Sequence, residues 1–394
     1  MKDLTVLISA SGSPSIPGII ACFKNNGERK IRVVGVDMSD EPSARYMVDA
    51  FYQVPAATHP DYCNILLDIC KKEHVDIYFP GVSAEVSALV KRWDDFKRIG
   101  VTLSVSNSNS VDVANNKLKT YQMLAEAGIP VPEYYPVHTV NDFVEGCKYM
   151  GYPQKPVCLK IVNGSGSRGV RIIDANKSRY QLFAHEKPNS FYTSYDDMLS
   201  ILKEVDVLDE LMLVEFMPGN EYTVDLLAHK GTVIYQVGRE NVVSLMSIAQ
   251  ESVLAYDRQA YKICSDVVRL MHMDGNVGFD FMRSADGTAV LMDINPRLTA
   301  TVSVIAAGGV NLPYLRIKQL LGEPFFRMAR KVPDLQPVPD FTVYGRYSHI
   351  AQPCPQHLST ADESPAGLPH GQSLQWYRNS SRQVRQPLSI LTCF

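Results

Sequence analysis

Two apolar strands joined by an Asp-Gly turn most constrain how this 394-residue chain can fold. The first strand, residues 278–282, contains Asp280, and the second runs from residue 288 to Asp293. An Asp-Gly pair between apolar runs is a strong signal for an antiparallel hairpin, because glycine adopts the positive φ that a tight turn needs. Pairing of these strands brings Asp280 close to Asp293 and Asn295.

The polar side chains of this hairpin predict a metal site. Asp293 and Asn295 are two positions apart, so on a strand they point to the same face. Carboxylate and amide oxygens suit Mg²⁺, which proteins usually bind together with phosphate oxygens, and Mn²⁺ accepts similar ligands. We expect Asp280, Asp293 and Asn295, with Arg297 nearby, to bind the metal jointly with phosphate oxygens. The alternative is a hairpin whose acids are merely solvated.

Composition places the chain among ordinary globular proteins. Its net charge is -3, hydrophobic residues make up 45%, and there is no long basic run, which argues against nucleic-acid and membrane partners. The eight cysteines are scattered without CxxC spacing, as expected of core thiols in a reducing compartment. No apolar stretch reaches transmembrane length, and the N-terminal apolar run is too short for a signal peptide. We therefore expect a cytoplasmic protein.

Strands and helices alternate in residues 1–107. Strands are expected at 5–9, 31–37 and 75–80, with helices at 16–24 and 62–72. Such alternation predicts a parallel sheet with crossover helices, a Rossmann-like α/β domain.

The turn at Gly12, with Asp37 ending the next strand, faintly resembles a dinucleotide fingerprint. It lacks the full GxGxxG, and Pro14 and Pro17 interrupt it. We favour a structural turn, or one that lines a substrate site, over an NAD site.

Residues 108–335 form a second region with a different pattern. One helix is expected from 112 to 128 and another from 139 to 150, followed by strands and helices in a mixed order. The strands are 157–162, 170–173, 211–216, 221–226 and 233–237, and the further helices are 194–205, 256–272 and 313–321. Residues 336–394 are rich in Pro, Ser and Gln and predict an irregular, poorly ordered tail.

A Gly-Ser loop at 163–169 follows the strand that carries Lys160. Glycine and serine let backbone N–H groups approach phosphate oxygens, and a neighbouring lysine adds positive charge. The loop joins two strands and lacks GxxxxGK[ST], so it is not a Walker A motif. A glycine-rich hairpin tip beside a chance lysine is the alternative.

The segment from Glu215 to Glu221 adds a second nucleotide signal. An adenine can lie against the strand end formed by Glu215, Phe216 and Met217, while Glu221, beyond the Pro-Gly turn, can accept hydrogen bonds from ribose. Solvated surface acids are the alternative for both glutamates.

Together these motifs resemble the ATP-grasp superfamily over about residues 108–335. Lys117 and Lys160 match the two phosphate-binding lysines, and the metal ligands and Arg297 occupy their expected places in the family's order. The loop residues Gly164, Ser165, Gly166, Ser167 and Gly169 match the phosphate lid, and Glu215 to Glu221 match the adenine and ribose segment. Asp293 stands where the family usually has Glu, and Asn116 replaces an acidic residue.

The resemblance implies a fold in which two α+β subdomains clasp ATP, with a lid at about 155–218. It implies an ATP-dependent ligase that joins a small-molecule carboxylate to an amine, or to a thiol, through an acyl phosphate with release of ADP and phosphate. Lys160 and Arg297 would be catalytic, and ATP and Mg²⁺ would be bound. A homodimer is one expectation for this architecture.

Within the superfamily the resemblance is nearest to carbamoyl-phosphate-synthase large-subunit-like proteins. The chain is too short for a two-module synthase and shows no glutaminase domain, which argues against carbamoyl phosphate synthesis. Asp225 and Arg239 line the acceptor side or form a structural salt bridge. Two other functions stay open: a nucleotide-binding regulatory or assembly module without catalysis, and a Rossmann oxidoreductase.

Overall fold

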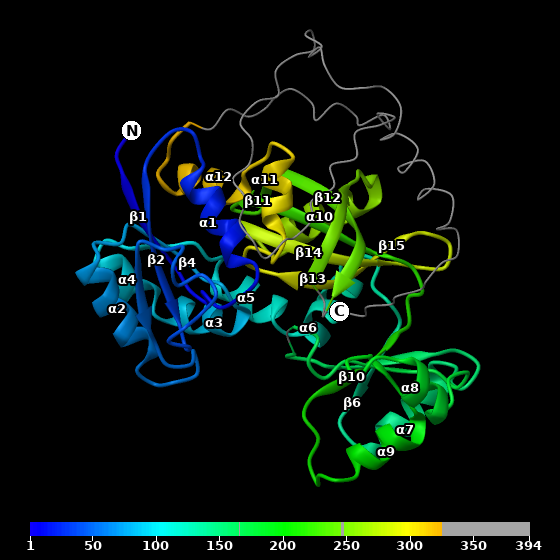
Figure 1. Ribbon diagram of the computed structural model, residues 1–394. Helices are drawn as coiled ribbons and strands as arrows, with labels where there is room; N and C mark the ends of the chain where they lie inside the picture. The colour runs from blue at the N-terminus through cyan, green and yellow to red at the C-terminus, as the bar shows by residue number, and fades with distance from the viewer. Residues whose placement is uncertain (165, 246–247, 325–394) are drawn as a thin grey trace, which may run out of the picture. The chain divides into compact units, whose positions relative to one another are not determined.

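Three five-stranded sheets organise the protein in a computed structural model that describes residues 1–164, 166–245 and 248–324. Figure 1 shows the arrangement of these elements along the chain. Ser165 of the predicted lid loop and the predicted tail at 336–394 lie outside the described residues.

The first sheet is parallel throughout, as predicted, with the strand order β3-β2-β1-β4-β5. Its strands are β1 (Leu4–Ile8), β2 (Ile31–Asp37), β3 (Ala50–Gln53), β4 (Ile77–Phe79) and β5 (Thr102–Leu103). Its helices are α1 (Ile16–Lys24), α2 (Tyr62–Lys72), α3 (Ser83–Lys91) and α4 (Trp93–Arg98). The strand order reverses at β1, so the loops after β1 and β4 meet at the edge where α/β sheets bind ligands.

Two short helices, α5 (Ser108–Ala114) and α6 (Lys117–Glu126), follow this sheet. The prediction of one helix from 112 to 128 was therefore wrong. Asn116 leaves the helical conformation, with φ -122° and ψ 101°, and its side chain accepts a hydrogen bond from the Lys119 N–H. This N-cap starts a new helix and places Lys117 in its first turn.

The second sheet has the strand order β6-β10-β7-β8-β9. Its strands are β6 (Tyr134–Val137), β7 (Val157–Ile161), β8 (Arg171–Ile173), β9 (Tyr192–Thr193) and β10 (Leu211–Glu215). Helices α7 (Val140–Tyr149), α8 (Arg179–His185) and α9 (Tyr195–Leu202) accompany it. The antiparallel pairing of β7 with β8 and β10 confirms the predicted strands on both sides of the Gly-Ser loop.

The third sheet is antiparallel, with the order β13-β12-β11-β14-β15. Its strands are β11 (Glu221–His229), β12 (Thr232–Leu245), β13 (Ile248–Leu254), β14 (Gly275–Arg283) and β15 (Ala289–Asn295). Helix α10 (Arg258–Leu270) packs Ile263 and Val267 into a core with Val224 and Phe279. The Asp-Gly hairpin is confirmed as β14 and β15.

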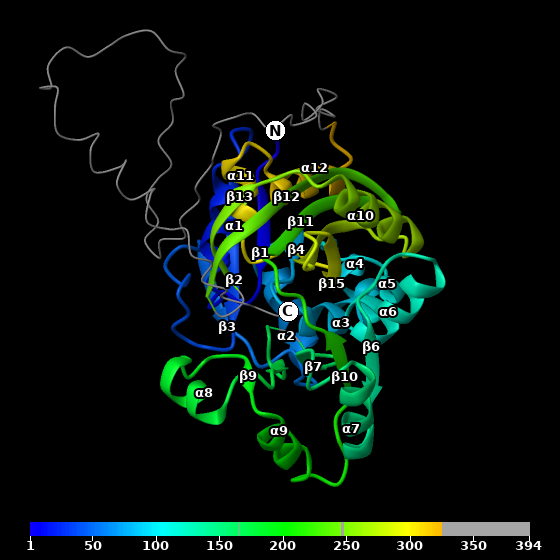
Figure 2. The ribbon, with the colours of Figure 1, turned by 90° about the vertical axis from the view of Figure 1, so that its right-hand side faces the viewer.

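Helices α11 (Val302–Ala307) and α12 (Leu312–Leu320) lie beside α1, as both views show (Figures 1 and 2). Ile305 and Ile317 share one hydrophobic cluster with Ile16, Val33 and Phe79 of the first sheet and its helices. This shared core holds the loop after β1 close to the chain that follows β15. The class predicted from the sequence, a parallel α/β domain followed by α+β subdomains, is confirmed.

Candidate functional site

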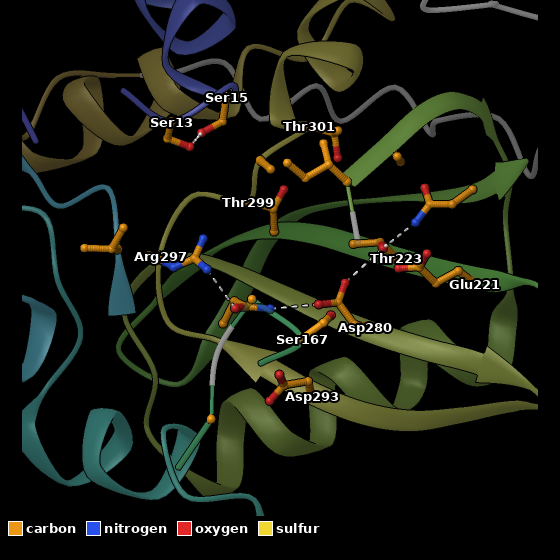
Figure 3. Close-up of a pocket in the computed structure, with 18 of the residues that line it drawn as sticks. Ser13, Ser15, Ser167, Glu221, Thr223, Asp280, Asp293, Arg297, Thr299 and Thr301 are labelled. Carbon is orange, nitrogen blue, oxygen red and sulfur yellow. Dashed lines mark hydrogen bonds between the residues drawn. The ribbon is translucent and has the colours of Figure 1, made fainter. Parts of the chain in front are cut away.

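The β14–β15 hairpin brings two acids and an amide together (Figure 3). The strand register pairs Asp280 with Asp293 and Gly278 with Asn295, with a bulge directly after the Asp280–Asp293 pair. Asn295 Nδ2 donates to Asp280 Oδ2 at 2.8 Å, and Thr223 Oγ1 on β11 donates to Asp280 Oδ1 at 2.9 Å. A bulge re-aims neighbouring side chains, and here it accompanies the convergence that the sequence predicted.

Two acids at this site, Asp280 and Glu221, have raised pKa values. Burial, followed by the charge of Asp293, raises the pKa of Asp280 to about 6. Burial, followed by the charge of Asp280, raises the pKa of Glu221 to about 8, although Ser244 Oγ donates to Glu221 Oε2 at 2.9 Å. Buried neighbouring carboxylates disfavour each other's charged form, and a bound cation would offset that repulsion.

The oxygens of Asp280, Asp293 and Asn295 suit a hard cation, and the Asn295 amide oxygen is needed beside the two carboxylates. Within the described ranges, no three His, Cys, Asp or Glu side chains are grouped so that they could hold a metal ion. The oxygens of Asp280 and Asp293 therefore need the Asn295 oxygen, and further ligands such as phosphate, to complete a Mg²⁺ shell. Asn295 Oδ1 also accepts a hydrogen bond from Arg297 Nη2 at 3.2 Å.

Lys117 links the acids to the Gly-Ser loop. Its Nζ donates to the Gly164 carbonyl oxygen at 2.9 Å and lies 3.2 Å from Asp293 Oδ2. The side chain is 8% exposed, so this contact is made in a largely water-excluded place where charge interactions are strong.

Arg297 joins the site to the first sheet's helices. Its Nε donates to Ser83 Oγ, in the first turn of α3, at 3.1 Å, and its Nη1 donates to the Leu298 carbonyl at 2.9 Å. Burial lowers the pKa of Arg297, while the nearby carboxylates oppose that shift. The guanidinium is therefore fixed in orientation beside Asn295.

Most residues of the predicted lid loop lie at the same cavity as these groups, but Lys160 does not. Gly164, Gly166 and Ser167 line the cavity, whereas Lys160 is fully buried on β7, opposite Met212, and is not among the residues that line it. Gly169 lies against Ile161, where a Cβ would come within 2.2 Å of Ile161 Cδ1. Whether a strand lysine such as Lys160 is buried or faces a cavity depends on how the sheet packs. The distance in sequence between the lysine and the loop does not reveal this.

The residues of the predicted adenine segment, Glu215 to Glu221, lie in different surroundings. Glu215 is exposed at the end of β10, with its Oε2 accepting from the Glu133 N–H at 3.4 Å. Phe216 packs against the Cys158 cluster, and Met217 is buried beside Met282. Only Glu221 of this segment lines the cavity that the paired acids and the loop share.

The cavity at this site has a volume of about 330 Å³ and joins three parts of the chain. Several of its residues were not identified from the sequence: Ser13, Ser15, Gly81 and Val82 from the loops after β1 and β4, Thr223 and Asn241 from the third sheet, and Thr299, Ala300 and Thr301 after β15. A period-two pattern of polar residues at 221, 223 and 225 was the one local signal that pointed to the sheet residues.

A buried ion pair forms part of the cavity wall. Arg239 Nε is 3.2 Å from Asp225 Oδ2, and Thr299 Oγ1 donates to Asp225 Oδ1 at 2.5 Å. Arg239 and Thr299 line the cavity while Asp225 lies beneath them. The expected salt bridge between Asp225 and Arg239 is therefore confirmed, and their place on the acceptor side stays a prediction.

The carboxylate of Asp37, at the end of β2, accepts hydrogen bonds that hold the turn after β1. The Gly12 N–H donates to Asp37 Oδ2 at 2.7 Å, and the Ser39 N–H donates to Asp37 Oδ1 at 2.9 Å. The carboxylate that would bind a dinucleotide ribose therefore holds the backbone, which supports a structural turn.

Two family descriptions match this chain in separate regions. "PylC-like, N-terminal domain" matches residues 6–104, and "ATP-grasp in the biosynthetic pathway with Ter operon" matches residues 207–341. Curated relatives include a formate-dependent phosphoribosylglycinamide formyltransferase of Ignicoccus hospitalis, 28% identical over 31% of this chain and 29% of that protein. Another is a carbamoyl-phosphate synthase of Methanobrevibacter smithii, 22% identical over 62% of this chain and 63% of the relative. The chain thus spans less than two thirds of these relatives.

Solved structures share the fold at low identity. The ADP complex of purK, N5-carboxyaminoimidazole ribonucleotide synthetase, has a TM-score of 0.61 and 15% identity, covering 82% of this chain and 78% of that one. The biotin carboxylase domain dimer of Hydrogenobacter thermophilus 2-oxoglutarate carboxylase, with MgADP and bicarbonate, has a TM-score of 0.60 and 16% identity, covering 83% and 71%. The chain therefore has an ATP-grasp fold. The resemblance to ATP-grasp ligases that the sequence indicated is confirmed.

No helix in the described part of the chain is both long enough and apolar enough to cross a membrane.

Proposed function

We propose that this protein is an ATP-dependent, ADP-forming ligase that joins a small carboxylate to an amine. The observation that carries the proposal is the position of Lys117, which contacts both Gly164 of the glycine-serine loop and Asp293 of the paired acids. These contacts support a positive charge between a loop that would hold phosphate and a pair of acids that would hold a cation. The same class of reaction is supported by the names of similar proteins: a carbamoyl-phosphate synthase, a formate-dependent formyltransferase, N5-carboxyaminoimidazole ribonucleotide synthetase and an L-amino acid ligase from Bacillus licheniformis.

The chemistry is a pair of displacement steps. A carboxylate oxygen attacks the γ-phosphorus of ATP, and the bond to the β-γ bridging oxygen breaks, releasing ADP and leaving an acyl phosphate. The amine nitrogen then attacks the acyl carbon, the carbon–oxygen bond to phosphate breaks, and the amine loses a proton as phosphate leaves. A thiol nucleophile would give a thioester by the same route.

The chain's own groups supply charge and alignment for these steps. Lys117 neutralises phosphate oxygens, and Arg297 stabilises charge on the transferred phosphoryl group and on the tetrahedral centre. The loop containing Gly164, Gly166 and Ser167 covers the phosphates and limits hydrolysis of the acyl phosphate. Lys160 would be the second phosphate lysine, which requires its buried side chain to reach the nucleotide.

The Asp280, Asp293 and Asn295 oxygens would hold Mg²⁺, which when bound supplies positive charge against the phosphate oxygens. The end of β10, at Glu215 to Met217, would receive the adenine, with Glu221 toward the ribose. The walls formed by Ser13, Ser15 and Thr299 leave room beside Arg297 for the carboxylate substrate. A protein homodimer is part of this proposal, as one structural relative is named as a dimer.

ADP and phosphate release from MgATP, with pooled carboxylic acids combined with pooled amines and thiols, tests the proposal. We expect release that needs both pools and that disappears in Asp293→Asn. Asp286→Asn, an exposed acid in the turn of the same hairpin, is the matched control and should retain turnover. Equal turnover in the Asp293→Asn protein would remove the site assignment.

The second candidate is a nucleotide-binding regulatory or assembly module. The side chain of Asp293 is shorter than the Glu usual in the family, and this difference favours a site that binds a nucleotide without turning it over. MgATP binding without ADP release across all pools would support this second candidate and contradict the ligase.

A further inference from the structure

A buried acid that the proposed reaction does not use lies in the first turn of α3. Glu85 is only 1% exposed, and Ser9 Oγ lies 2.5 Å from its Oε1 and 2.7 Å from its Oε2. The hydroxyl of Tyr78, on β4, also donates to Oε1. Burying a carboxyl group costs free energy even when it is hydrogen-bonded, and an apolar side chain in the same space would avoid that cost. What Glu85 contributes is therefore the fixed position of the groups bonded to it.

Ser9 connects Glu85 to the loop between β4 and α3. A serine hydroxyl has one hydrogen to donate and two lone pairs that accept. The Ser9 hydroxyl donates its hydrogen to Glu85, so its lone pairs are left to accept, and the Gly81 N–H donates to Ser9 Oγ at 2.8 Å. The carboxylate of Glu85 thus sets the orientation in which Ser9 holds Gly81.

Gly81 lies very close to the chain that follows β1. A Cβ at residue 81 would come within 2.4 Å of the Ser9 carbonyl oxygen and 3.0 Å of Ala10 Cβ, so only glycine fits here. Ala10 itself has φ 54°, a conformation that costs a residue with a Cβ free energy. Such a conformation persists only where the surrounding structure enforces it. The loops after β1 and β4 are therefore held against each other.

The loop that Ser9 holds leads directly to Ser83, which binds Arg297. Arg297 Nε donates to Ser83 Oγ at 3.1 Å, while Arg297 Nη2 donates to Asn295 Oδ1 at 3.2 Å. A guanidinium is planar, so hydrogen bonds on two of its nitrogens fix its plane. One of these acceptors lies in the N-terminal domain and the other on β15. The N-terminal domain therefore sets part of the orientation of Arg297.

We propose that Glu85 is a positioning residue of the proposed ligase site. Through Ser9 and Gly81 it holds the loop of residues 81–83, and Ser83 directs the Arg297 guanidinium toward the transferred phosphoryl group. Glu85 touches no substrate, and its effect on the reaction passes through Ser83. This inference rests on the proposed ligase function and gives the N-terminal domain a part in the reaction beyond lining the cavity.

Trapping of the acyl phosphate by hydroxylamine, with MgATP and pooled carboxylic acids, measures kcat and the KM for ATP of each variant. Assays at pH 8 keep Glu85 ionised, because burial raises its pKa to about 7. Ser83→Ala removes the acceptor for Arg297, and Ser83→Thr keeps the hydroxyl. Glu85→Gln leaves only one oxygen to accept hydrogen bonds. Ser200→Ala, at an exposed serine on α9, is the matched control.

We expect Ser83→Ala and Glu85→Gln each to lower kcat about tenfold or more and to change the KM for ATP less than about twofold, because ATP still binds while Arg297 is misaligned. Ser83→Thr should recover most of kcat, and Ser200→Ala should retain it. The Ser83→Ala/Glu85→Gln double variant should be no slower than Ser83→Ala alone, because both changes act through one contact.

An absence of hydroxamate in the natural protein would contradict the proposed function and this inference with it. Turnover in the natural protein with kcat retained in Ser83→Ala would overturn the inference alone. Losses that multiply in the double variant would also overturn it, since Glu85 would then act by another route. Ser9→Ala, which removes the link between Glu85 and Gly81, replaces Glu85→Gln if urea unfolding shows that the latter protein does not fold.

Discussion

At the scale of single residues, the site depends on where one lysine begins a helix. The Asn116 side chain accepts from the Lys119 N–H and starts α6 at Lys117, so the lysine side chain projects from the first turn toward Gly164 and Asp293. Asn116, which stands where the family usually has an acid, is thus the N-cap of α6.

Replacing Lys117 should abolish ligase turnover. Lys117→Gln removes the charge between the loop and the paired acids, and we expect kcat/KM for ATP to fall about a hundredfold or more. Lys119→Gln, an exposed lysine two positions along the same helix, should leave turnover unchanged. Equal loss in both variants would mean that the helix, rather than the Lys117 charge, is responsible.

Glu85 should make stability depend on pH. Burial raises the pKa of Glu85 from 4.5 to about 7, although Ser9 Oγ donates to its Oε2 at 2.7 Å. The folded chain therefore holds this proton more tightly than the unfolded chain. The resulting stabilisation is fully present below about pH 4.5 and is lost as the pH rises through about 7.

Urea unfolding of the natural chain and of Glu85→Gln across this range isolates that contribution. We expect the free energy of unfolding of the natural chain to fall relative to Glu85→Gln between pH 4.5 and 7. A difference between the two proteins that does not change with pH would contradict the prediction.

At the scale of elements, the sequence predicted the helices and strands whose signals lie in neighbouring residues. It did not predict those that depend on packing. The Asp-Gly hairpin, α2 and α10 follow from turn chemistry and periodicity, which are written in neighbouring residues. The elements missed were β3, β5, β6, β9, β13, α3, α4, α8 and α11. Most of these are short, α11 being only six residues long, and β13 is an edge strand with weak alternation.

The residues of the candidate site also fall into those that local sequence predicts and those that depend on packing. Asp280, Asp293 and Asn295 converge as predicted, because one hairpin contains all three. The turn around Gly12 was expected to be structural or to line a substrate site, and Ser13 in this turn lines the cavity. Thr299 and the burial of Lys160 depend on contacts between distant segments, which no local pattern reveals.

Strand β14 tolerates Thr299 only because residue 278 is glycine. A Cβ at Gly278 would come within 2.1 Å of Thr299 Cγ2, so Gly278→Ala should destabilise the protein by about 1–3 kcal/mol. Thr299→Ser removes that methyl group and keeps the hydroxyl that donates to Asp225. The Gly278→Ala/Thr299→Ser double variant should recover most of the lost stability in urea unfolding, and an unchanged deficit would contradict the stated cause.

At the scale of the whole described molecule, the first sheet and the chain after β15 share one core. Besides the cluster around Ile305, Lys318 Nζ lies 2.6 Å from Glu28 Oε2 and Arg29 Nε donates to Tyr314 Oη at 3.1 Å. The predicted boundary near residue 107 stays a prediction, but α12 packs with elements on both sides of it.

This shared core should make the first and third sheets unfold together. Ile305 is fully buried in the cluster, so Ile305→Ala should cost about 2–5 kcal/mol and shift a single calorimetric transition that includes both sheets. Ile201→Ala, at a half-exposed position on α9, should leave that transition in place. Two separate transitions, with only one shifted by Ile305→Ala, would contradict the prediction.

The central claim is that the chain activates a carboxylate with ATP. The most direct measurement supplies MgATP, pooled carboxylic acids and hydroxylamine, which traps an acyl phosphate as a hydroxamate. We predict hydroxamate formed in equal amount to ADP, dependent on the acid pool and absent in Lys117→Gln. Bound MgATP with neither hydroxamate nor ADP formed, across all acids, would contradict the account.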